Sequence, residues 1–157
     1  MTAPKTLDDL LAIEAIKQLK ARYFLFMDTK RWDEWRELFT DDVRVEGGPP
    51  HDSRDAFVDF VGRGLEHVQS AHQGHTPIIE VTSESTARGT WAMSDDLLFP
   101  AGHPWAGTQP RRCGYGHYEE EYRRVDGDWK IASMRLTRLA EWDEGLPGTR
   151  RAPTGSR

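Results

Sequence analysis

An apolar stripe that ends at a corner is the feature that most constrains the fold of this chain. The members of the stripe recur at helical spacing within roughly a third of a helix circumference: Ile13, Ile16, Leu19, Tyr23, Phe26 and Met27. They predict a helix that begins near Thr6 or Leu7, with Thr6 as its N-cap, and ends near Met27. A corner follows at Asp28 and Thr29. The carboxylate of Asp28 therefore lies at the end of an element, where it can border a cavity.

A second and shorter stripe follows the corner. Trp32, Trp35, Leu38 and Phe39 share one face of a helix predicted over about 31–39. Residues 43–46 then alternate like the edge of a strand, and the Gly-Gly-Pro-Pro run at 47–50 breaks it. Ser53 can cap a third helix, whose apolar face consists of Phe57, Phe60, Val61 and Leu65.

The rest of the chain has the pattern of β-strands. The predicted strands are 68–72, 78–81, 86–98, 113–125 and 129–139, and an Asp-Gly-Asp turn at 126–128 joins the last two as a hairpin. The loop over 99–112, rich in proline and glycine, has the length of a functional lid. Helices followed by antiparallel strands predict an α+β fold. We expect about three N-terminal helices to cover one face of a cone-shaped, curved antiparallel sheet and to enclose a pocket.

Length and charge limit the classes of function. The 157 residues correspond to one domain, which we place at 7–140 between a frayed N-terminus (1–6) and a flexible tail (141–157) with almost nothing apolar. The net charge of −5 argues against nucleic-acid binding, and no apolar run is long enough for a transmembrane helix. The N-terminus lacks the pattern of a secretory signal, and the single cysteine, Cys113, fits a reducing compartment. The sequence thus predicts a cytoplasmic protein that binds neither nucleic acid nor membranes.

Several motifs resemble one family. They are Arg22-Tyr23 to Asp28 with the tryptophan-rich helix after it, His72-Gln-Gly-His75, Gly114-Tyr-Gly-His-Tyr118, and the ending 126–138. Together they are similar to SnoaL-like proteins of the nuclear-transport-factor-2-like superfamily, in the subgroup with scytalone dehydratase, bile acid 7-alpha-dehydratase and lindane dehydrochlorinase. The resemblance covers about residues 7–140 and implies an α+β cone. It also implies a cofactor-independent enzyme, although the superfamily includes dehydratases, isomerases, cyclases and non-enzymes.

The resemblance further implies a catalytic set. In the eliminating members an aspartate on a helix orients a histidine on a strand, which acts as the base, and a tyrosine or lysine five residues before that aspartate faces the same pocket. The matching residues here are Asp28, His72 and Tyr23. Some members also have a pocket arginine on the last strand. Arg138 is the candidate, and Arg135 points to the opposite face of its strand.

The strands contain further candidates for substrate binding. Trp91 could belong to a pocket wall or to the core. Tyr115 and His117 share one side of their strand while Tyr118 shares the other, and the alternation does not tell which side faces the pocket. His75 ends the motif that His72 begins, but residues three apart on a strand point to opposite faces. The two histidines would therefore not ligate one ion, and no metal site is predicted.

Two classes of function remain open. The first is a dehydratase-like lyase or an isomerase that acts on a hydrophobic, cyclic small molecule, with polyketide-cyclase-like chemistry as a variant. His72, oriented by Asp28, would remove a proton, and Tyr23 would hydrogen-bond the developing oxyanion or the departing hydroxyl. The second class is a non-catalytic module for small-molecule binding or for assembly. The resemblance also implies a homodimer or a homotrimer that buries the outer face of the sheet.

Overall fold

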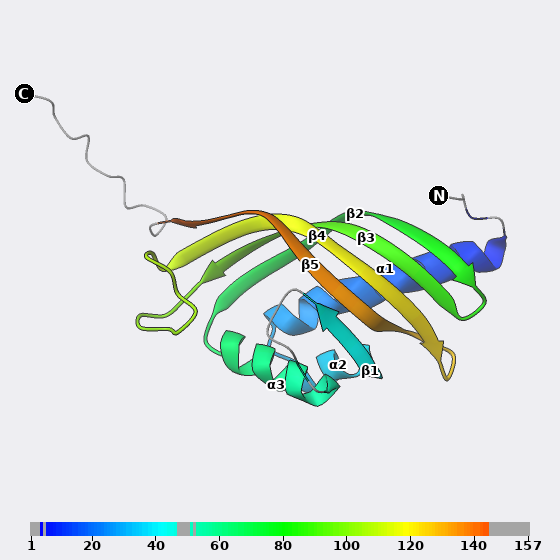
Figure 1. Ribbon diagram of the computed structural model, residues 1–157, viewed down its shortest axis with the longest axis horizontal. Helices are drawn as coiled ribbons and strands as arrows, with labels where there is room; N and C mark the ends of the chain where they lie inside the picture. The colour runs from blue at the N-terminus through cyan, green and yellow to red at the C-terminus, as the bar shows by residue number, and fades with distance from the viewer. Residues whose placement is uncertain (1–3, 5, 47–50, 52, 145–157) are drawn as a thin grey trace, which may run out of the picture.

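The computed structural model describes residue 4, residues 6–46, residue 51 and residues 53–144. Within these ranges the elements, in chain order, are α1 (Leu7–Asp28), α2 (Trp32–Arg36), β1 (Phe39–Glu46), α3 (Arg54–Leu65), β2 (Gln69–Ser83), β3 (Thr86–Leu98), β4 (Arg111–Val125) and β5 (Asp128–Glu144). Figure 1 shows one sheet that curves over the helices, with α1 along its concave side and with α2 and α3 below one end. The α+β fold predicted from the sequence is confirmed.

The strand order in the sheet is β1-β5-β4-β3-β2, so the sheet is open, with β1 and β2 at its edges. Strands β2 to β5 pair with their neighbours in antiparallel fashion, as expected. The exception is β1, which runs parallel to β5. Alternation along 43–46 has no direction, and a parallel partner can be distant in sequence, so this pairing was not predictable from the strand pattern.

Two predicted boundaries are wrong. The segments 68–72 and 78–81 belong to the single strand β2, whose register with β3 shifts between Gly74 and Pro77. A proline that cannot donate a hydrogen bond is tolerated there because β2 is an edge strand. The second helix ends at Arg36 instead of reaching 39, because Phe39 begins β1.

The C-terminal boundary also differs. Strand β5 continues to Glu144, so residues 141–144 are not part of a tail. Arg111 and Arg112 of the neighbouring strand donate hydrogen bonds to Glu144 and Asp143 at 2.7 and 3.1 Å. We predicted no strand here because the segment has few apolar residues. In the structure these ion pairs, instead of apolar contacts, join it to β4. The rest of the predicted tail, 145–157, and most of the predicted frayed N-terminus lie outside the described residues.

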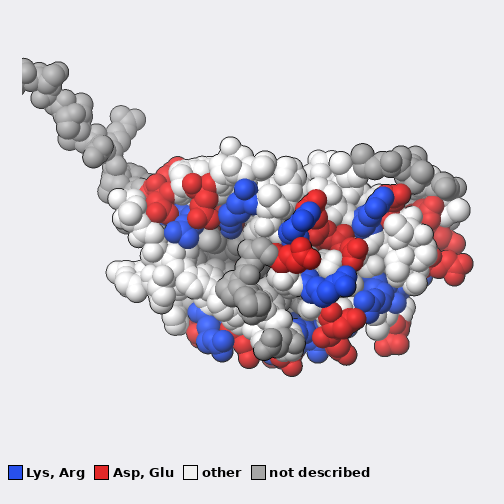
Figure 2. All heavy atoms as spheres, in the orientation of Figure 1, with Lys and Arg blue, Asp and Glu red and all other residues white. Residues whose placement is uncertain are grey.

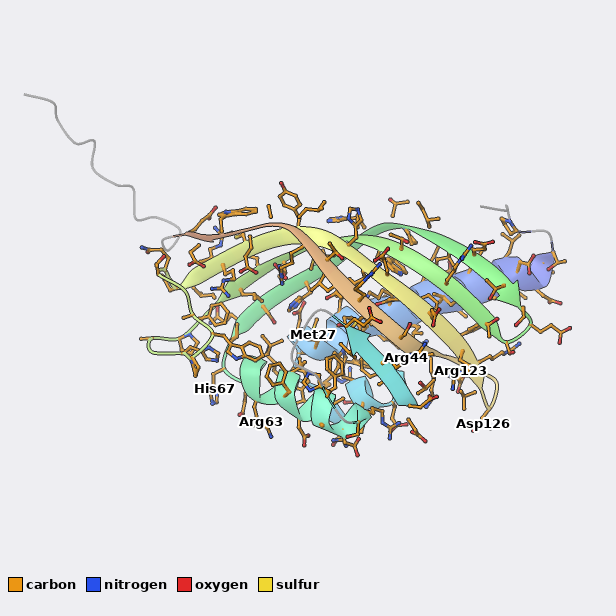
Figure 3. The ribbon with its side chains drawn as sticks, viewed as in Figure 1. Met27, Arg44, Arg63, His67, Arg123 and Asp126 are labelled. Carbon is orange, nitrogen blue, oxygen red and sulfur yellow. The ribbon has the colours of Figure 1, made fainter. Side chains whose placement is uncertain are left out.

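Helix α1 has the capped start that its sequence predicts. The Asp9 N–H donates to Thr6 Oγ1 at 3.0 Å, and the Thr6 N–H donates to the Asp9 carboxylate at 3.1 Å. This is a capping box, which satisfies amide groups that the first turn leaves free. The inner face of the helix packs into the core, and Figure 3 shows Met27 near its end beneath the sheet.

The core lies between α1, α2 and the concave face of the sheet. It is largely aromatic: the ring of Trp35 packs against Phe39 with centroids 4.9 Å apart and against Phe57 at 5.4 Å. On the face seen in Figure 2, acidic and basic side chains lie beside one another. Arg123 and Asp42 form one of the ion pairs of the protein surface. No helix in the described ranges is both long and apolar enough to cross a membrane.

Candidate functional site

Alternation along the strands decides which side chains reach the concave face. His72 on β2 lies opposite Asp95 on β3, and Asp95 lies opposite Gly114 on β4. Residues directly opposite one another in a ladder point to the same side of a sheet. His72 contacts Asp28 at the end of α1, so this row of residues faces the helices.

His72 and Asp28, which lie 44 positions apart in the chain, are in direct contact. The ring atom Nδ1 of His72 lies 2.6 Å from Asp28 Oδ1, and the main-chain N–H of His72 donates to Asp28 Oδ2 at 2.8 Å. The hydroxyl of Ser70 also donates to Oδ1, at 2.8 Å. Both carboxylate oxygens are therefore hydrogen-bonded, and the orientation of the carboxylate is fixed from β2.

The end of α1 places Asp28 at this position. The Thr29 N–H donates to the Leu25 carbonyl at 2.9 Å, and the Arg31 N–H donates to the Phe26 carbonyl at 2.8 Å. The main chain then turns through Lys30, which has a φ of 61°. Asp28 is thus the last helical residue, and its side chain leaves the helix toward β2.

The electrostatics of the pair select one tautomer of His72. Burial would raise the pKa of Asp28, but the hydrogen bonds and charge of His72 and the hydrogen bond of Ser70 outweigh it and lower this pKa below its usual value. An ionised carboxylate can only accept hydrogen bonds, so Nδ1 carries the hydrogen. In the neutral ring Nε2 then has the free electron pair. Among the residues that the structure describes, Nε2 has no hydrogen-bond partner.

Arg138 lies on the same concave face. Its guanidinium donates to both carboxylate oxygens of Asp95, at 3.0 and 2.5 Å. A Cβ atom on Gly114 would lie 2.4 Å from Nη1 of Arg138, so the glycine leaves the space that this side chain occupies. Burial would lower the pKa of Arg138, but the hydrogen bond and charge of Asp95 raise it. Arg135 instead pairs with the exposed Glu119 on the other face, as the alternation predicted.

Asp95 was missed in the sequence. Its carboxylate is fully buried and lies in line with Trp91, Met93 and Leu97, which share its side of β3. A carboxylate on the apolar side of a strand indicates a buried ion pair, because a buried charge needs a partner of opposite sign. That partner, Arg138, lies 43 residues away.

Tyr23 is buried in an aromatic cluster and is not hydrogen-bonded to His72. Its hydroxyl donates to the sulfur of Met134 at 3.5 Å, and its ring packs against that of Tyr118 at 5.9 Å. Burial raises the pKa of Tyr23, and the neighbouring Tyr118 raises it further. Trp91 is also buried, and its indole N–H donates to the Tyr122 hydroxyl at 2.8 Å. The structure thus places Tyr23 and Trp91 in the interior and brings neither into contact with the His72–Asp28 pair.

Three predicted residues lie on the convex face. Ser94, which alternates with the buried Met93 and Asp95, accepts or donates a hydrogen bond at 3.1 Å with Nε2 of His75. Tyr115 lies opposite Ser94, and His117 follows it on the same side of β4. His75, Tyr115 and His117, which we named as candidates for substrate binding, therefore lie on the face of the sheet opposite to His72. The alternation gave two sides of the strand but no information on which one the helices cover.

A loop at one end of the sheet contacts α3. It joins β3 to β4, and its Trp105 packs against Phe60 of α3 with ring centroids 5.2 Å apart (Figure 1). A Cβ atom on Gly64 of α3 would lie 1.8 Å from the indole of Trp105. The indole therefore packs against Gly64 in a space that any larger residue would fill. The loop therefore connects the sheet with α3.

Two hollows lie elsewhere on the molecule. One, of about 1120 Å³, lies between the N-terminal half of α1 and the strand ends near Trp129. The other, of about 520 Å³, lies on the convex face between Arg44, Arg88 and Arg135. Neither is lined by His72 or Asp28. In the described ranges, no group of three or more His, Cys, Asp and Glu side chains is arranged to hold a metal ion.

The chain is similar to proteins of known structure. A family model described as "SnoaL-like domain" matches residues 8–135. A scytalone dehydratase-like protein from Novosphingobium aromaticivorans is 22% identical, with a TM-score of 0.75 over 92% of this chain and 98% of that one. A hexachlorocyclohexane dehydrochlorinase from Novosphingobium barchaimii is 21% identical, with a TM-score of 0.73 over 94% and 98%. A protein of unknown function from Mycobacterium tuberculosis is 26% identical, with a TM-score of 0.67 over 82% and 77%.

Proposed function

This chain belongs to the SnoaL-like domain family, and from that premise we propose that it is a dehydratase-like lyase or an isomerase that works without a cofactor. The observation that carries the proposal is the contact between His72 Nδ1 and Asp28, which leaves Nε2 free. A histidine held in this way is a general base near neutral pH. Two similar structures are named for eliminations, a dehydratase and a dehydrochlorinase, and this supports the same reaction type here.

The reaction begins with the transfer of a proton to Nε2 of His72 from a carbon next to an electron-withdrawing group. The electron pair of the broken C–H bond forms a double bond, and in a dehydration the hydroxyl on the adjacent carbon leaves with its bonding electrons. The imidazolium returns the proton to this hydroxide, so water is released and the base is regenerated. Asp28, which stays ionised, stabilises the imidazolium in between. An isomerase would instead return the proton to a different carbon of the same substrate.

Two buried phenols are the candidate donors for negative charge that develops on the substrate. Tyr23 is the donor that we predicted, and Tyr118 lies beside it on the concave side of β4. Burial raises the pKa of Tyr118, while Tyr23 lowers it by a hydrogen bond. A phenol that stays protonated can donate to an oxyanion, and such a donor is worth about 2.7–4 kcal/mol in a dry site. The Tyr23 hydroxyl would have to exchange Met134 for the substrate.

The charges around the site favour an uncharged substrate. Asp95 already binds the guanidinium of Arg138, and Asp28 faces the ammonium of Lys30 through Ser70. This balance leaves no excess of positive charge to attract a carboxylate or a phosphate. Apart from Asp95, the buried side chains nearby on β3 and at the start of the loop are apolar, including Met93, Leu97 and Phe99. We therefore propose a neutral, hydrophobic, cyclic substrate.

The experiment is a ligand screen followed by a turnover assay. Steroid-like, phenolic and polyketide-like carbonyl compounds are tested for thermal stabilisation of the protein, which follows from binding to the folded state. Stabilising compounds are then incubated with wild type, His72→Ala and the matched control His75→Ala, whose side chain lies on the convex face. Mass spectrometry detects the loss of water, and ultraviolet absorbance detects a new or shifted double bond.

We expect wild type and His75→Ala to turn over the same compound, and His72→Ala to be slower by about 10²–10⁴-fold. Equal rates in wild type and His72→Ala would overturn the proposed role of His72. If compounds stabilise all three proteins and none is converted, the non-catalytic binding module is favoured instead. Ring closure without loss of mass would identify the polyketide-cyclase-like variant.

We also propose that the protein self-associates as a homodimer or a homotrimer through the convex face of the sheet. Large hydrophobic side chains lie exposed there: Ile78 is 51% exposed, Tyr115 47% and Trp142 42%. Such side chains on one face of a sheet favour burial against another surface. The cytoplasmic location remains a proposal that rests on the free, buried thiol of Cys113.

A further inference from the structure

A chain of hydrogen bonds extends beyond the His72–Asp28 pair to a lysine. The Nζ atom of Lys30 donates to the Ser70 hydroxyl at 2.9 Å, and that hydroxyl donates to Asp28 Oδ1 at 2.8 Å. Oδ1 is the same oxygen that lies 2.6 Å from Nδ1 of His72. The ammonium is therefore joined to the imidazole through one hydroxyl and one carboxylate. All three residues that support the ring lie at the corner after α1 or at the start of β2.

The backbone of Lys30 suggests that its side chain is needed. Its φ of 61° lies in the left-handed region, at the position after a helix where glycine or asparagine is usual. A lysine there has a less favourable backbone than glycine would have. Its ammonium is also partly buried: burial lowers the pKa of Lys30, and the charge of Asp28 raises it. Two unfavourable features thus coincide in a residue whose charged end reaches the site.

We infer that Lys30 is a positioning residue, which acts through Ser70 to orient Asp28 and places a positive charge near the His72 ring. The inference deepens the proposed function and rests on it, because only a neutral ring can act as the base. A positive charge near an imidazole disfavours its protonation, whereas Asp28 alone favours it. The charge of Lys30 therefore acts against that of Asp28, while the hydroxyl of Ser70 holds the carboxylate beside Nδ1.

The other charged groups around His72 are placed differently from Lys30. Asp95 faces the ring from β3, directly opposite His72 in the ladder. Arg138 faces the same region from β5, but its guanidinium is hydrogen-bonded to Asp95 and its Nε lies 3.3 Å from Glu141. Asp28 contributes from α1 and Lys30 from the corner after it. Of these four groups, Lys30 is the cation that the hydrogen bonds connect to Asp28.

The test is an NMR titration of the His72 ring in the full chain. The signal is identified among those of the six histidines by its loss in His72→Gln. We compare wild type with Lys30→Met, which removes the charge and keeps the apolar stem, and with Lys30→Arg, which keeps the charge. Lys17→Met is the control, because Lys17 is an exposed lysine of α1 that pairs only loosely with Glu14, at 3.7 Å.

We expect the pKa of His72 to rise by about half a unit or more in Lys30→Met, since a neighbouring cation is lost. Lys30→Arg and Lys17→Met should keep the wild-type value. Ser70→Ala should also change the His72 titration, because it interrupts the chain of hydrogen bonds. A titration curve in Lys30→Met that coincides with wild type would overturn the inference. An equal shift in Lys30→Arg would overturn it as well, since the charge would then not be the cause.

A stability measurement separates positioning from a structural role. Lys30→Gly relieves the left-handed backbone, so its melting temperature should equal or exceed that of wild type while its His72 titration shifts like that of Lys30→Met. A lower melting temperature with an unshifted titration would mean that Lys30 only supports the fold. The titration needs no substrate. If no compound is converted by wild type, the proposed enzyme fails, and the effect of Lys30 on His72 is still decided by the NMR result.

Discussion

At the scale of single residues, Asp28 combines a poor helical position with a favourable set of donors. It is the last residue of α1, where the partial negative charge of the helix end disfavours a carboxylate, and no basic residue occupies the last turn. Hydrogen bonds from Ser70 and from the main chain and ring of His72 more than compensate, so the pKa of Asp28 lies below its usual value. The same contacts that prepare a base therefore also stabilise the fold.

The first prediction concerns Asp28→Asn. Asparagine cannot accept from all three donors without turning its own N–H groups toward one of them, so the variant should be less stable by about 1–3 kcal/mol near neutral pH. A lowered pKa in the folded state stabilises the protein above the pKa of the unfolded chain, and this contribution is lost as the pH falls through the folded value. Urea unfolding of wild type and variant from neutral to acidic pH measures the gap between their free energies of unfolding.

The gap in the free energy of unfolding should be full above about pH 5 and should shrink below about pH 4. Asp33→Asn serves as the control, since Asp33 lies on the surface with 97% of its side chain exposed. It should show little change at any pH. A gap between wild type and Asp28→Asn that stays constant down to acidic pH would contradict the role given to the ionised carboxylate.

At the scale of elements, local signals predicted those features that local chemistry controls. The stripe and cap of α1, the corner at Asp28 and the hairpin at 126–128 depend on residues that are near one another in sequence, and the structure confirms them. The continuity of β2 was missed, because Gly74 and Pro77 stop a central strand but are tolerated at an edge. Whether a strand lies at an edge is decided by the whole sheet.

The same limit applies to the candidate site. Asp28, His72 and Arg138 were predicted from a resemblance to a family, and the structure brings all three to the concave face; their catalytic roles stay predictions. Asp95 and Lys30 were missed because their partners, Arg138 and Ser70, lie 43 and 40 residues away. The side of Tyr115 and His117 stayed open, because alternation defines two faces of a strand without saying which one the helices cover.

The second prediction tests how α1 is held to the sheet. Lys20 of α1 and Glu120 of β4 form an ion pair in which both side chains are completely buried, and the ammonium also lies 3.9 Å from the ring centre of Tyr23. Burial lowers the pKa of Lys20, although the charge of Glu120 opposes this. Lys20→Met and Glu120→Gln should each destabilise the protein by about 3–5 kcal/mol, because each leaves one buried charge unpaired.

The double variant is the decisive comparison. Because it leaves no unpaired charge, its loss of stability in urea unfolding should be far below the sum of the two single losses. Glutamine at 120 can still accept from the Tyr122 hydroxyl, so this hydrogen bond is retained. Lys17→Met, in the same helix but at the surface, should change stability little. Additive losses in the double variant would show that the two charges do not depend on one another.

At the scale of the whole molecule, the two faces of the sheet have different surroundings. The concave face is covered by the helices and holds the buried pairs of His72 with Asp28 and of Arg138 with Asp95. The convex face combines exposed ion pairs, such as Arg88 with Glu80, with exposed apolar side chains. Arg44 and Arg123 near the β1 edge pair with acidic residues as well (Figure 3). Aromatic side chains are enriched where proteins bind one another, so the exposed aromatic residues of this face are the part to test for the proposed self-association.

The third prediction is that Ile78→Glu and Tyr115→Glu weaken self-association. Both residues are about half exposed on the convex face, and a glutamate at either position would have to lose its hydration on burial in an interface. Light scattering after size-exclusion chromatography should give the mass of two or three chains for wild type and a smaller mass for each variant. Leu7→Glu is the matched control, because Leu7 is 70% exposed but lies at the start of α1.

The outcome also bears on the site. Some convex-face variants should dissociate without losing their fold. NMR titration of His72 in such a monomer would show whether one chain alone holds the His72–Asp28 contact. A wild-type mass of a single chain would contradict the proposed assembly, and dissociation by Leu7→Glu alone would move the interface to α1. Since every contact described around His72 comes from one chain, we expect its titration to be the same in the dissociated variants as in wild type.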